Sequence, residues 1–251
     1  MMNVYWLEQT AADVPARDDW LSAGEKNRLA AFRIPKRRDD WRLGRWTGKC
    51  LVAHRLGLPD TASDLATIEL KSAISGAPEV FIAQRPAPLA VSLSHRAGRA
   101  LCVVANSGAA LGCDLELIES RSEEFIADYF TDSEQALMSW ASAEDRLRLA
   151  ALLWSAKESA LKALQVGLLL NTRSVTVIPA LSSTVKNDWC PLQVDYVGGQ
   201  RFHGCWRSSN DFLRTLVAAP GSPQPVPVVL PLSSRRPVPA ITETGIQFAY
   251  R

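Results

Sequence analysis

The sequence predicts an α+β fold, because each half of the chain contains one major helix pattern and several separate strand patterns. With 251 residues, 47% of them apolar, the chain can bury a sizeable core as one large domain or two small ones. We expect an N-terminal half over 1–108, a C-terminal half over 109–219 and a proline-rich tail over 220–251. No internal sequence repeat is strong enough to relate the two halves.

The first half begins with an apolar strand and continues with helices and short strands. Pro35 is well placed to begin the second helix, because proline is favoured at the first helical position. In chain order we expect a strand over 1–7, a helix over 18–32, a helix that starts at Pro35 within the basic run 33–55, a strand over 67–70, a turn at 75–78 and a strand over 89–93.

The helix that begins near Pro35 carries a concentrated run of positive charge. Its cations follow one another at intervals of four, three and four residues, which aligns them along one face: Arg38, Arg42, Arg45 and Lys49. A solvated helix face is one interpretation of this pattern. The other is an anion site, because aligned cations repel one another and arginine suits phosphate.

An acidic strand over 111–116 is the second strand of a predicted hairpin, because it follows an apolar run and the turn-type residues at 106–108. Side chains alternate along a strand, so Asp114 and Glu116 share one face. Two close carboxylates need a proton, a cation or a metal ion to offset their repulsion, unless they lie on a solvated edge. His95, at the end of the preceding strand, should lie nearby, either as a structural hydrogen-bonding group or as part of a site.

Two helices are expected in the second half. Thr131 and Glu134 form a capping box that begins a helix over 132–141, and a longer helix over 143–166 ends at Gly167. The frequent prolines that follow the last strand argue against further sheet or helix and indicate a loosely attached tail. Strands are expected over 174–178, 192–197, 200–206 and 212–218, and the prolines recur over 220–239.

Composition argues against several classes of protein. The net charge of +2 gives no general attraction to nucleic acid or membrane, so any basic patch must be local. Five scattered cysteines without a Cys-x-x-Cys pair suit a reducing compartment and do not indicate a zinc site. No apolar run approaches the ~20 residues of a membrane helix, so we expect a soluble cytoplasmic protein.

Two motifs about forty residues apart carry a resemblance to a known family. Gly-Cys-Asp-Leu-Glu over 112–116 and Trp-Ser-Ala-Lys-Glu-Ser-Ala-Leu-Lys over 154–162 resemble the paired signature of the 4′-phosphopantetheinyl transferases, of the larger surfactin-synthetase-activating type. Three further pieces follow that family's order: Gly44-Arg45 in the basic helix, Ser-Leu-Ser-His over 92–95, and Glu134.

The resemblance implies an enzyme that transfers the 4′-phosphopantetheine group of coenzyme A to a serine of an apo acyl or peptidyl carrier protein and releases adenosine 3′,5′-bisphosphate. It also implies Mg²⁺ and a pseudo-dimer of two similar halves, each a helix packed on a small antiparallel sheet, with the coenzyme site in the cleft between. A fused pseudo-dimer completes its own site, so we expect a monomer. The motifs do not specify whether the carrier serves fatty-acid, polyketide or nonribosomal-peptide biosynthesis.

The same resemblance implies the residues of the site. The metal ligands are three carboxylates, which suit Mg²⁺: Asp114, Glu116 and Glu158. The residues expected to take part in catalysis are Glu158, Lys162, Lys157 and Glu134, with Glu158 or Glu134 accepting the proton of the carrier serine. Coenzyme A is expected to contact Arg38, Arg45, Ser94, His95, Lys157 and Lys162. Where many relatives have Gly-Lys-Pro, this chain has Ala77 in place of lysine, and Lys71 is the candidate to replace that cation.

Other interpretations predict different properties. A nucleic-acid-binding module would use the basic helix, but it predicts a more basic chain and gives the three carboxylates no task. A coenzyme A-binding scaffold or regulator would keep every motif but would not turn over. For single residues, the alternatives are a capping role for Glu134 and a surface ion pair between Glu158 and Lys162.

Overall fold

The computed structural model describes residues 1–166, 170–180 and 189–230. The N-terminal half contains β1 (Met2–Thr10), α1 (Ala23–Ala30), α2 (Pro35–Leu56), α3 (Ala62–Leu65), β2 (Ile68–Ser72), β3 (Pro78–Ile82), β4 (Arg85–Pro86), β5 (Leu89–Arg96) and β6 (Arg99–Asn106). The C-terminal half contains β7 (Ala110–Leu117), α4 (Glu123–Tyr129), α5 (Asp132–Ser139), α6 (Ala143–Ala163), β8 (Val175–Pro179), β9 (Cys190–Tyr196), β10 (Arg201–Ser209) and β11 (Phe212–Ala219), and β12 (Pro223–Pro227) follows. These elements confirm the α+β class.

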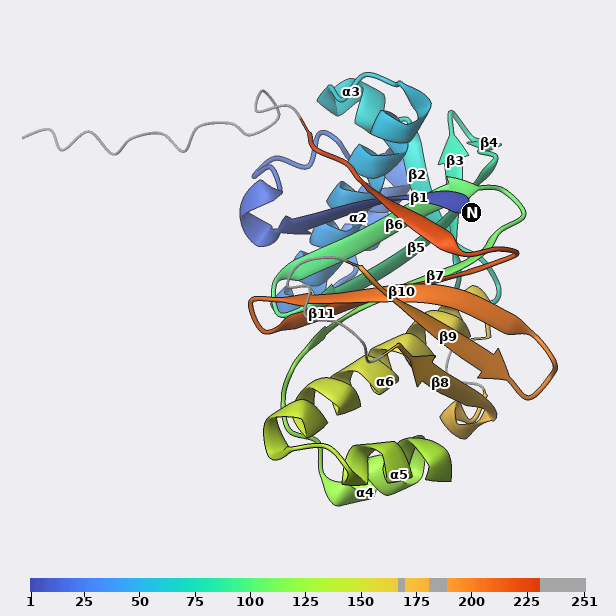
Figure 1. The fold of residues 1–251 in the computed structure, drawn as a ribbon. Coiled ribbons are helices and arrows are strands. Elements are labelled where there is room, and N and C mark those ends of the chain that lie inside the picture. The colour runs from blue at the N-terminus through green and yellow to red at the C-terminus, as the bar shows by residue number, and fades with distance from the viewer. Residues whose placement is uncertain (167–169, 181–188, 231–251) are drawn as a thin grey trace, which may run out of the picture.

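Two sheets, each covered by one long helix, form the two halves (Figure 1). In the N-terminal half, α2 packs on a sheet with the strand order β12-β1-β6-β5. In the C-terminal half, α6 packs on an antiparallel sheet with the order β7-β11-β10-β9-β8. One helix on one small sheet in each half agrees with the pseudo-dimer that the resemblance implies, and a third sheet, β2-β3-β4, extends the N-terminal half.

The two sheets meet along β5 and β7, where the predicted hairpin is wrong. In the described residues β6 pairs with β1 and β5, whereas β7 pairs with β11, so the turn after Asn106 connects two sheets. The backbone N–H of Cys113 donates to the hydroxyl of Ser92 at 3.1 Å, so a side chain links the facing strands. A short turn between two apolar strands can close a hairpin within one sheet or connect two sheets. The local sequence does not distinguish these topologies, because the choice depends on how the faces of the sheets are buried.

The ends of the main helices follow local sequence signals. Pro35 occupies the first turn of α2, and Gly57 ends that helix with φ of +64°, a conformation that glycine adopts at low cost. The predicted capping box of Thr131 and Glu134 begins α5. The longer helix α6 ends at Ala163, and the predicted stop at Gly167 lies outside the described residues.

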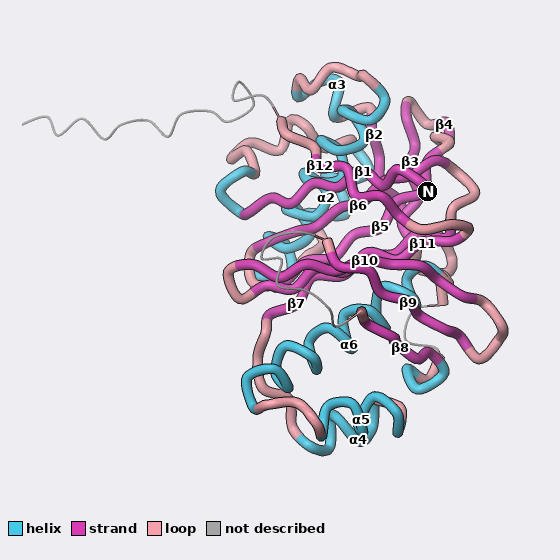
Figure 2. Tube along the Cα trace, viewed as in Figure 1, coloured by secondary structure: helices cyan, strands magenta, loops and turns pink. Residues whose placement is uncertain are grey.

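The beginning of the proline-rich tail forms a strand, so the expectation of no further sheet is wrong there. β12 pairs in parallel with β1, as Figure 2 shows at the edge of the sheet. Pro223, Pro225 and Pro227 stand at every second position, and Val228 N–H donates to the carbonyl of Trp6 at 2.9 Å. Because an edge strand bonds on one side only, alternate prolines can direct their missing donors outward.

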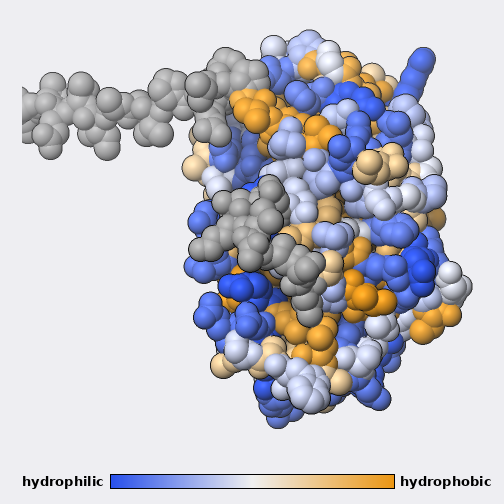
Figure 3. Space-filling model, in the orientation of Figure 1, coloured by the Kyte–Doolittle hydropathy of each residue, from blue (hydrophilic) through white to orange (hydrophobic). Residues whose placement is uncertain are grey.

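The surface is chemically mixed. Figure 3 shows hydrophilic and hydrophobic residues interspersed over the face that it presents. No helix in the described parts of the chain combines the length and the apolar character needed to cross a membrane. The buried apolar residues gather in the cores on which α2 and α6 pack.

Candidate active site

A glycine allows the acidic strand β7 to approach helix α6. A Cβ atom at Gly112 would lie 1.8 Å from the carbonyl oxygen of Ser159, so only glycine fits at this crossing. The close approach brings the carboxylates of β7, at Asp114 and Glu116, beside Glu158 of α6. The two motifs that the sequence separates therefore build one site.

Asp114 is the centre of this cluster. It is 4% exposed, and its Oδ1 accepts hydrogen bonds from Ser94 Oγ and from Lys162 Nζ, both at 2.7 Å. Lys162 also donates to the carbonyl of Cys113 at 3.0 Å. Burial, the largest single influence, acts to lower the pKa of Lys162, but Asp114, Cys113 and Glu158 together raise it and the net shift is upward, so the ammonium is retained. The surface ion pair between Glu158 and Lys162 is therefore not the one that the structure forms.

Glu116 is held by cations and by an indole. Its Oε1 accepts from Trp154 Nε1 at 3.1 Å, and its Oε2 lies 3.2 Å from Arg121 and 3.5 Å from Arg96. Burial and the charge of Asp114 raise the pKa of Glu116 despite these arginines. Arg121 was not singled out in the sequence, because no motif or periodicity marks it, whereas Trp154 stands inside the second motif.

Glu158 lies in surroundings that disfavour its negative charge, although Lys162 offsets part of the effect. Its Oε1 is buried and has no hydrogen-bond partner among the described residues. Burial and the charge of Asp114 raise the pKa of Glu158, since both penalise a further carboxylate. Asp114 Oδ2 is also buried without a partner within the same residues. Two carboxylate oxygens of the cluster are therefore buried without a hydrogen-bond donor among the described residues, although Lys162, Arg121 and Arg96 supply cations to its other oxygens.

A divalent cation would supply positive charge to both unpaired oxygens. The donors are hard carboxylate oxygens, which Mg²⁺ prefers, and two of these oxygens are buried and unpaired in the described chain. Residues 1–166, 170–180 and 189–230 contain no group of three or more acidic, histidine or cysteine side chains already arranged around a metal position. The carboxylates thus fit Mg²⁺ in charge and chemistry, and substrate phosphates would have to supply part of any coordination shell.

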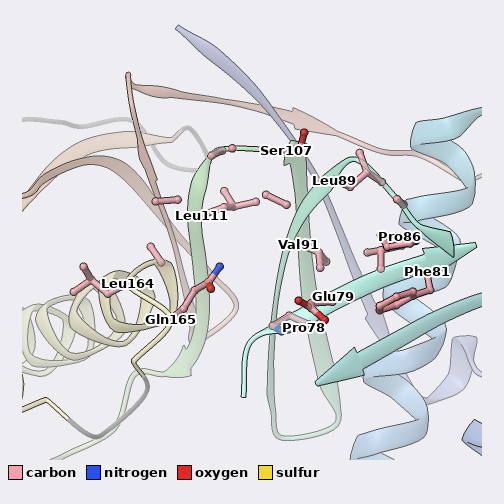
Figure 4. A pocket seen from close by; sticks show the side chains of 17 residues that line it. Pro78, Glu79, Phe81, Pro86, Leu89, Val91, Ser107, Leu111, Leu164 and Gln165 are labelled. Carbon is pink, nitrogen blue, oxygen red and sulfur yellow. The ribbon is translucent and has the colours of Figure 1, made fainter. Parts of the chain in front are cut away.

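A groove of about 520 Å³ lies between the halves (Figure 4), and its described lining includes no side chain of the acidic cluster. Leu111 of β7 and Leu164 and Gln165 at the end of α6 form one wall, whereas Pro78 and Phe81 of β3 belong to the other. The groove therefore begins within three residues of Asp114 and Lys162 along their own elements. It has room for part of an extended ligand between the halves.

The basic residues lie toward one end of α2. Arg55, in the last turn, donates to Asn106 at the end of β6, so the earlier turns of α2 extend toward the end of β5 that carries His95. Arg45 lies over the ring of Trp41 at 5.0 Å, and burial lowers its pKa. His95 and Arg38 are exposed.

The predicted line of four cations is only partly available for an anion. Lys49 is fully buried and forms an ion pair with Glu25, while Arg42 lies 2.7 Å from Asp18. These partners could not be predicted from local sequence, because Asp18 and Glu25 lie in segments that precede the helix. The anion-site interpretation therefore fails for Lys49, whose charge is already balanced inside the fold.

The candidate substitute for the missing lysine also has a partner. Lys71 Nζ lies 2.9 Å from Glu69 and 4.5 Å from the ring centre of Phe81. Ala77 stands in the turn that leads into β3, directly before the groove residue Pro78. The charge of Lys71 is thus already shared with Glu69 in the N-terminal half.

Lys157 and Glu134 contact each other, and their contacts described below do not include the acidic cluster. Both are buried, with Lys157 Nζ 2.8 Å from Glu134 Oε2. Lys157 also donates to the carbonyls of Thr172 and Val175 at 2.9 and 2.5 Å. Each of these contacts lies in the interior of the C-terminal half.

Comparison with known proteins agrees with the motifs. Residues 110–216, from β7 into β11, match the family model of the 4′-phosphopantetheinyl transferase superfamily. Among solved structures, the chain is similar to the Thermotoga maritima holo-[acyl-carrier-protein] synthase (AcpS), with 22% identity, a TM-score of 0.31, and coverage of 43% of this chain and 61% of that one. The chain thus spans about three fifths of that protein's length. No curated protein matches. The family match supports the enzyme class predicted from the sequence.

Proposed function

We propose that this protein is a phosphopantetheinyl transferase of the larger type, which moves 4′-phosphopantetheine from coenzyme A to a serine of an apo acyl or peptidyl carrier protein with the help of Mg²⁺. The observation that carries the proposal is the convergence of Asp114, Glu116, Glu158 and Lys162 where β7 crosses α6. Two halves within one chain support the larger, self-contained type and a monomer. We place its activity in the cytoplasm.

The chemistry requires charge to be neutralised on a pyrophosphate. The serine hydroxyl forms a bond to the phosphorus of the phosphopantetheine, and the pyrophosphate P–O bond breaks with its electron pair leaving on adenosine 3′,5′-bisphosphate. Such a transfer is accelerated mainly by positioning and by electrostatic stabilisation. Asp114, Glu116 and Glu158 would hold Mg²⁺, which would supply positive charge to the phosphate oxygens.

Two side chains of α6 take the remaining tasks. Lys162 is kept protonated beside Asp114, so it can stabilise the phosphate of the departing nucleotide. Glu158 Oε1 is buried and unpaired within the described residues, and the raised pKa of Glu158 favours acceptance of the serine proton. One helical turn separates these two groups, so one helix places both.

The N-terminal half would bind the nucleotide end of coenzyme A. The earlier turns of α2, with Arg45 and the exposed Arg38, extend toward the end of β5 that carries the exposed His95. The fork of arginine suits the 3′-phosphate. Ser94 already donates to Asp114, which links β5 of the N-terminal half to the acidic cluster.

The test is the release of adenosine 3′,5′-bisphosphate from coenzyme A in the presence of an apo carrier protein and Mg²⁺. Glu158→Gln should abolish release, whereas Glu144→Gln, the same change at an exposed position of α6, should leave it intact. Coenzyme A binding without release by the folded wild-type protein would overturn the proposal in favour of a non-catalytic coenzyme A-binding scaffold or regulator.

A further inference from the structure

The buried pair of Lys157 and Glu134 is a structural junction of three elements, α5, α6 and β8. Glu134 receives a hydrogen bond from the N–H of Thr131 at 2.8 Å, which caps α5, and another from the N–H of Val177 in β8 at 2.8 Å. Lys157 brings α6 to the same carboxylate and to the carbonyl of Thr172. The junction therefore fixes the rotation of α6 against α5 and β8.

The N-terminal half contains a second junction of the same construction. Ser22 caps α1, and its N–H donates to Glu25 at 3.1 Å, while Leu70 N–H in β2 donates to Glu25 at 3.4 Å. Lys49 of α2 forms an ion pair with Glu25 and donates to the carbonyl of Leu65 at 3.1 Å. In each half, the accepting carbonyl precedes the donating strand N–H by five residues.

Further details of the two junctions match. Lys49 lies 5.6 Å from the ring centre of Trp20, and Lys157 lies 5.9 Å from that of Phe130, so an aromatic ring before the cap covers each lysine. Both lysines are fully buried, and both glutamates are the third helical residue of a capping box. Such agreement in caps, partners and ring contacts indicates a duplicated device.

The two lysines also end similar four-residue segments, a likeness too short to be recognised as a repeat from the sequence alone. Trp-Thr-Gly-Lys over 46–49 corresponds to Trp-Ser-Ala-Lys over 154–157, and the next residue differs in chemistry. Lys157 is followed by Glu158 of the acidic cluster, whereas Lys49 is followed by Cys50, a thiol that is 3% exposed. The N-terminal junction is thus complete without any carboxylate to position.

We propose that Lys157 and Glu134 are positioning residues, which set the rotation of α6 and hence the place of Glu158. Lys49 and Glu25 form the same support in the half that holds no carboxylate of the acidic cluster. This assignment rests on the function proposed above. It takes the general-base role away from Glu134 and the phosphate contact away from Lys157. Successive helix residues are about 100° apart, so a lysine anchored on one side of α6 fixes the direction of its neighbour.

The test compares single and double substitutions in both junctions. Lys157→Met leaves a buried carboxylate without its cation, and adding Glu134→Gln removes that charge while keeping a capping oxygen. Lys49→Met and Lys49→Met/Glu25→Gln are the matched controls. The melting temperature is measured for all four, and kcat and the KM for coenzyme A are measured below the lowest melting temperature.

Both single substitutions should lower the melting temperature, and both doubles should regain much of the loss. Lys157→Met should lower kcat by about tenfold or more with the KM for coenzyme A within about twofold, and the double should recover at least about threefold in kcat. Lys49→Met should keep kcat within about threefold of wild type, because α2 carries no carboxylate of the acidic cluster, and a displacement of Arg45 on α2 would change the KM for coenzyme A.

Two results would overturn the assignment while the wild-type enzyme is active. One is a wild-type kcat in Lys157→Met. The other is a double substitution that regains its melting temperature but is no more active than Lys157→Met, which would show that one of the two groups acts on the substrate directly. A wild-type protein without transfer would refute the proposed function and the positioning role with it, and the paired melting temperatures would still decide whether the junctions are equivalent.

Discussion

Replacement of Gly112 by alanine tests the close approach of β7 to α6. The added Cβ would lie 1.8 Å from the carbonyl oxygen of Ser159 and 3.0 Å from the backbone nitrogen of Ala163. Ordinary carbon to oxygen contacts are about 3.3 Å or longer, so strand and helix would have to separate by roughly 1.5 Å. Both atoms that the Cβ meets are backbone, so a rotamer change cannot relieve the clash.

The separation should affect stability and activity together. Overpacking of this kind costs about 1–3 kcal/mol, or a fall in melting temperature of roughly 2–12 °C for a chain of this size. The 2.7 Å contact between Asp114 and Lys162 spans the same crossing. A displacement of about 1 Å at reacting groups can lower the rate about 100-fold, so kcat for phosphopantetheine transfer should fall by about that factor.

Thermal unfolding and initial rates of transfer, both measured below the lower melting temperature, would check this expectation. Gly44→Ala is the control, because no atom lies within 4 Å of a Cβ at that position in α2. It should raise stability by about 0.5–1 kcal/mol, since alanine favours a helix interior over glycine. A Gly112→Ala protein with wild-type stability and rate would refute the structural reasoning.

Three further predictions concern a thiol, a carboxylate and the edge strand. Burial raises the pKa of the Cys113 thiol from 9.0 to about 12, so the folded protein retains a proton that the unfolded chain loses. The free energy of unfolding, measured with denaturant, should therefore fall as the pH rises from 9.0 toward 12, and it should fall less steeply in Cys113→Ala. Burial and the charge of Asp114 raise the pKa of Glu158, so its ionised carboxylate lowers stability at neutral pH, and Glu158→Gln should raise the melting temperature at pH 7. Protons also compete with Mg²⁺ for this carboxylate, so the acid limb of the pH profile of wild-type activity should move to lower pH as the Mg²⁺ concentration is raised. Val226→Pro should lower the free energy of unfolding by about 1–3 kcal/mol through a lost ladder hydrogen bond, whereas Pro225→Ala should leave it nearly unchanged; equal effects would contradict the alternation described for β12.

The sequence predicted features that depend on local chemistry. Pro35 and the capping box of Thr131 and Glu134 mark helix starts, because a missing donor or a side-chain acceptor acts within one turn. Strand alternation placed Asp114 and Glu116 together, and both lie in the candidate site. Signals of this range can be read without knowledge of the fold.

Features that depend on distant partners were not predictable in the same way. The burial of Lys49 requires Glu25, which comes from another helix, and a solvated cation has the same local pattern. Arg121 reaches Glu116 only because the chain turns after β7. The alternation of Pro223 and Pro225 was present in the sequence, but it predicts an edge strand only when β1 offers a free edge.

The most direct test of the account is the intact mass of apo carrier proteins after incubation with this protein, coenzyme A and Mg²⁺, alongside a sample with chelator. The account predicts that at least one carrier gains the mass of a phosphopantetheine group, and that the gain is lost with chelator or with Asp114→Asn. A gain that persists in Asp114→Asn would contradict the proposed site, and no gain on acyl or peptidyl carriers, with coenzyme A bound to folded protein, would contradict the proposed transfer.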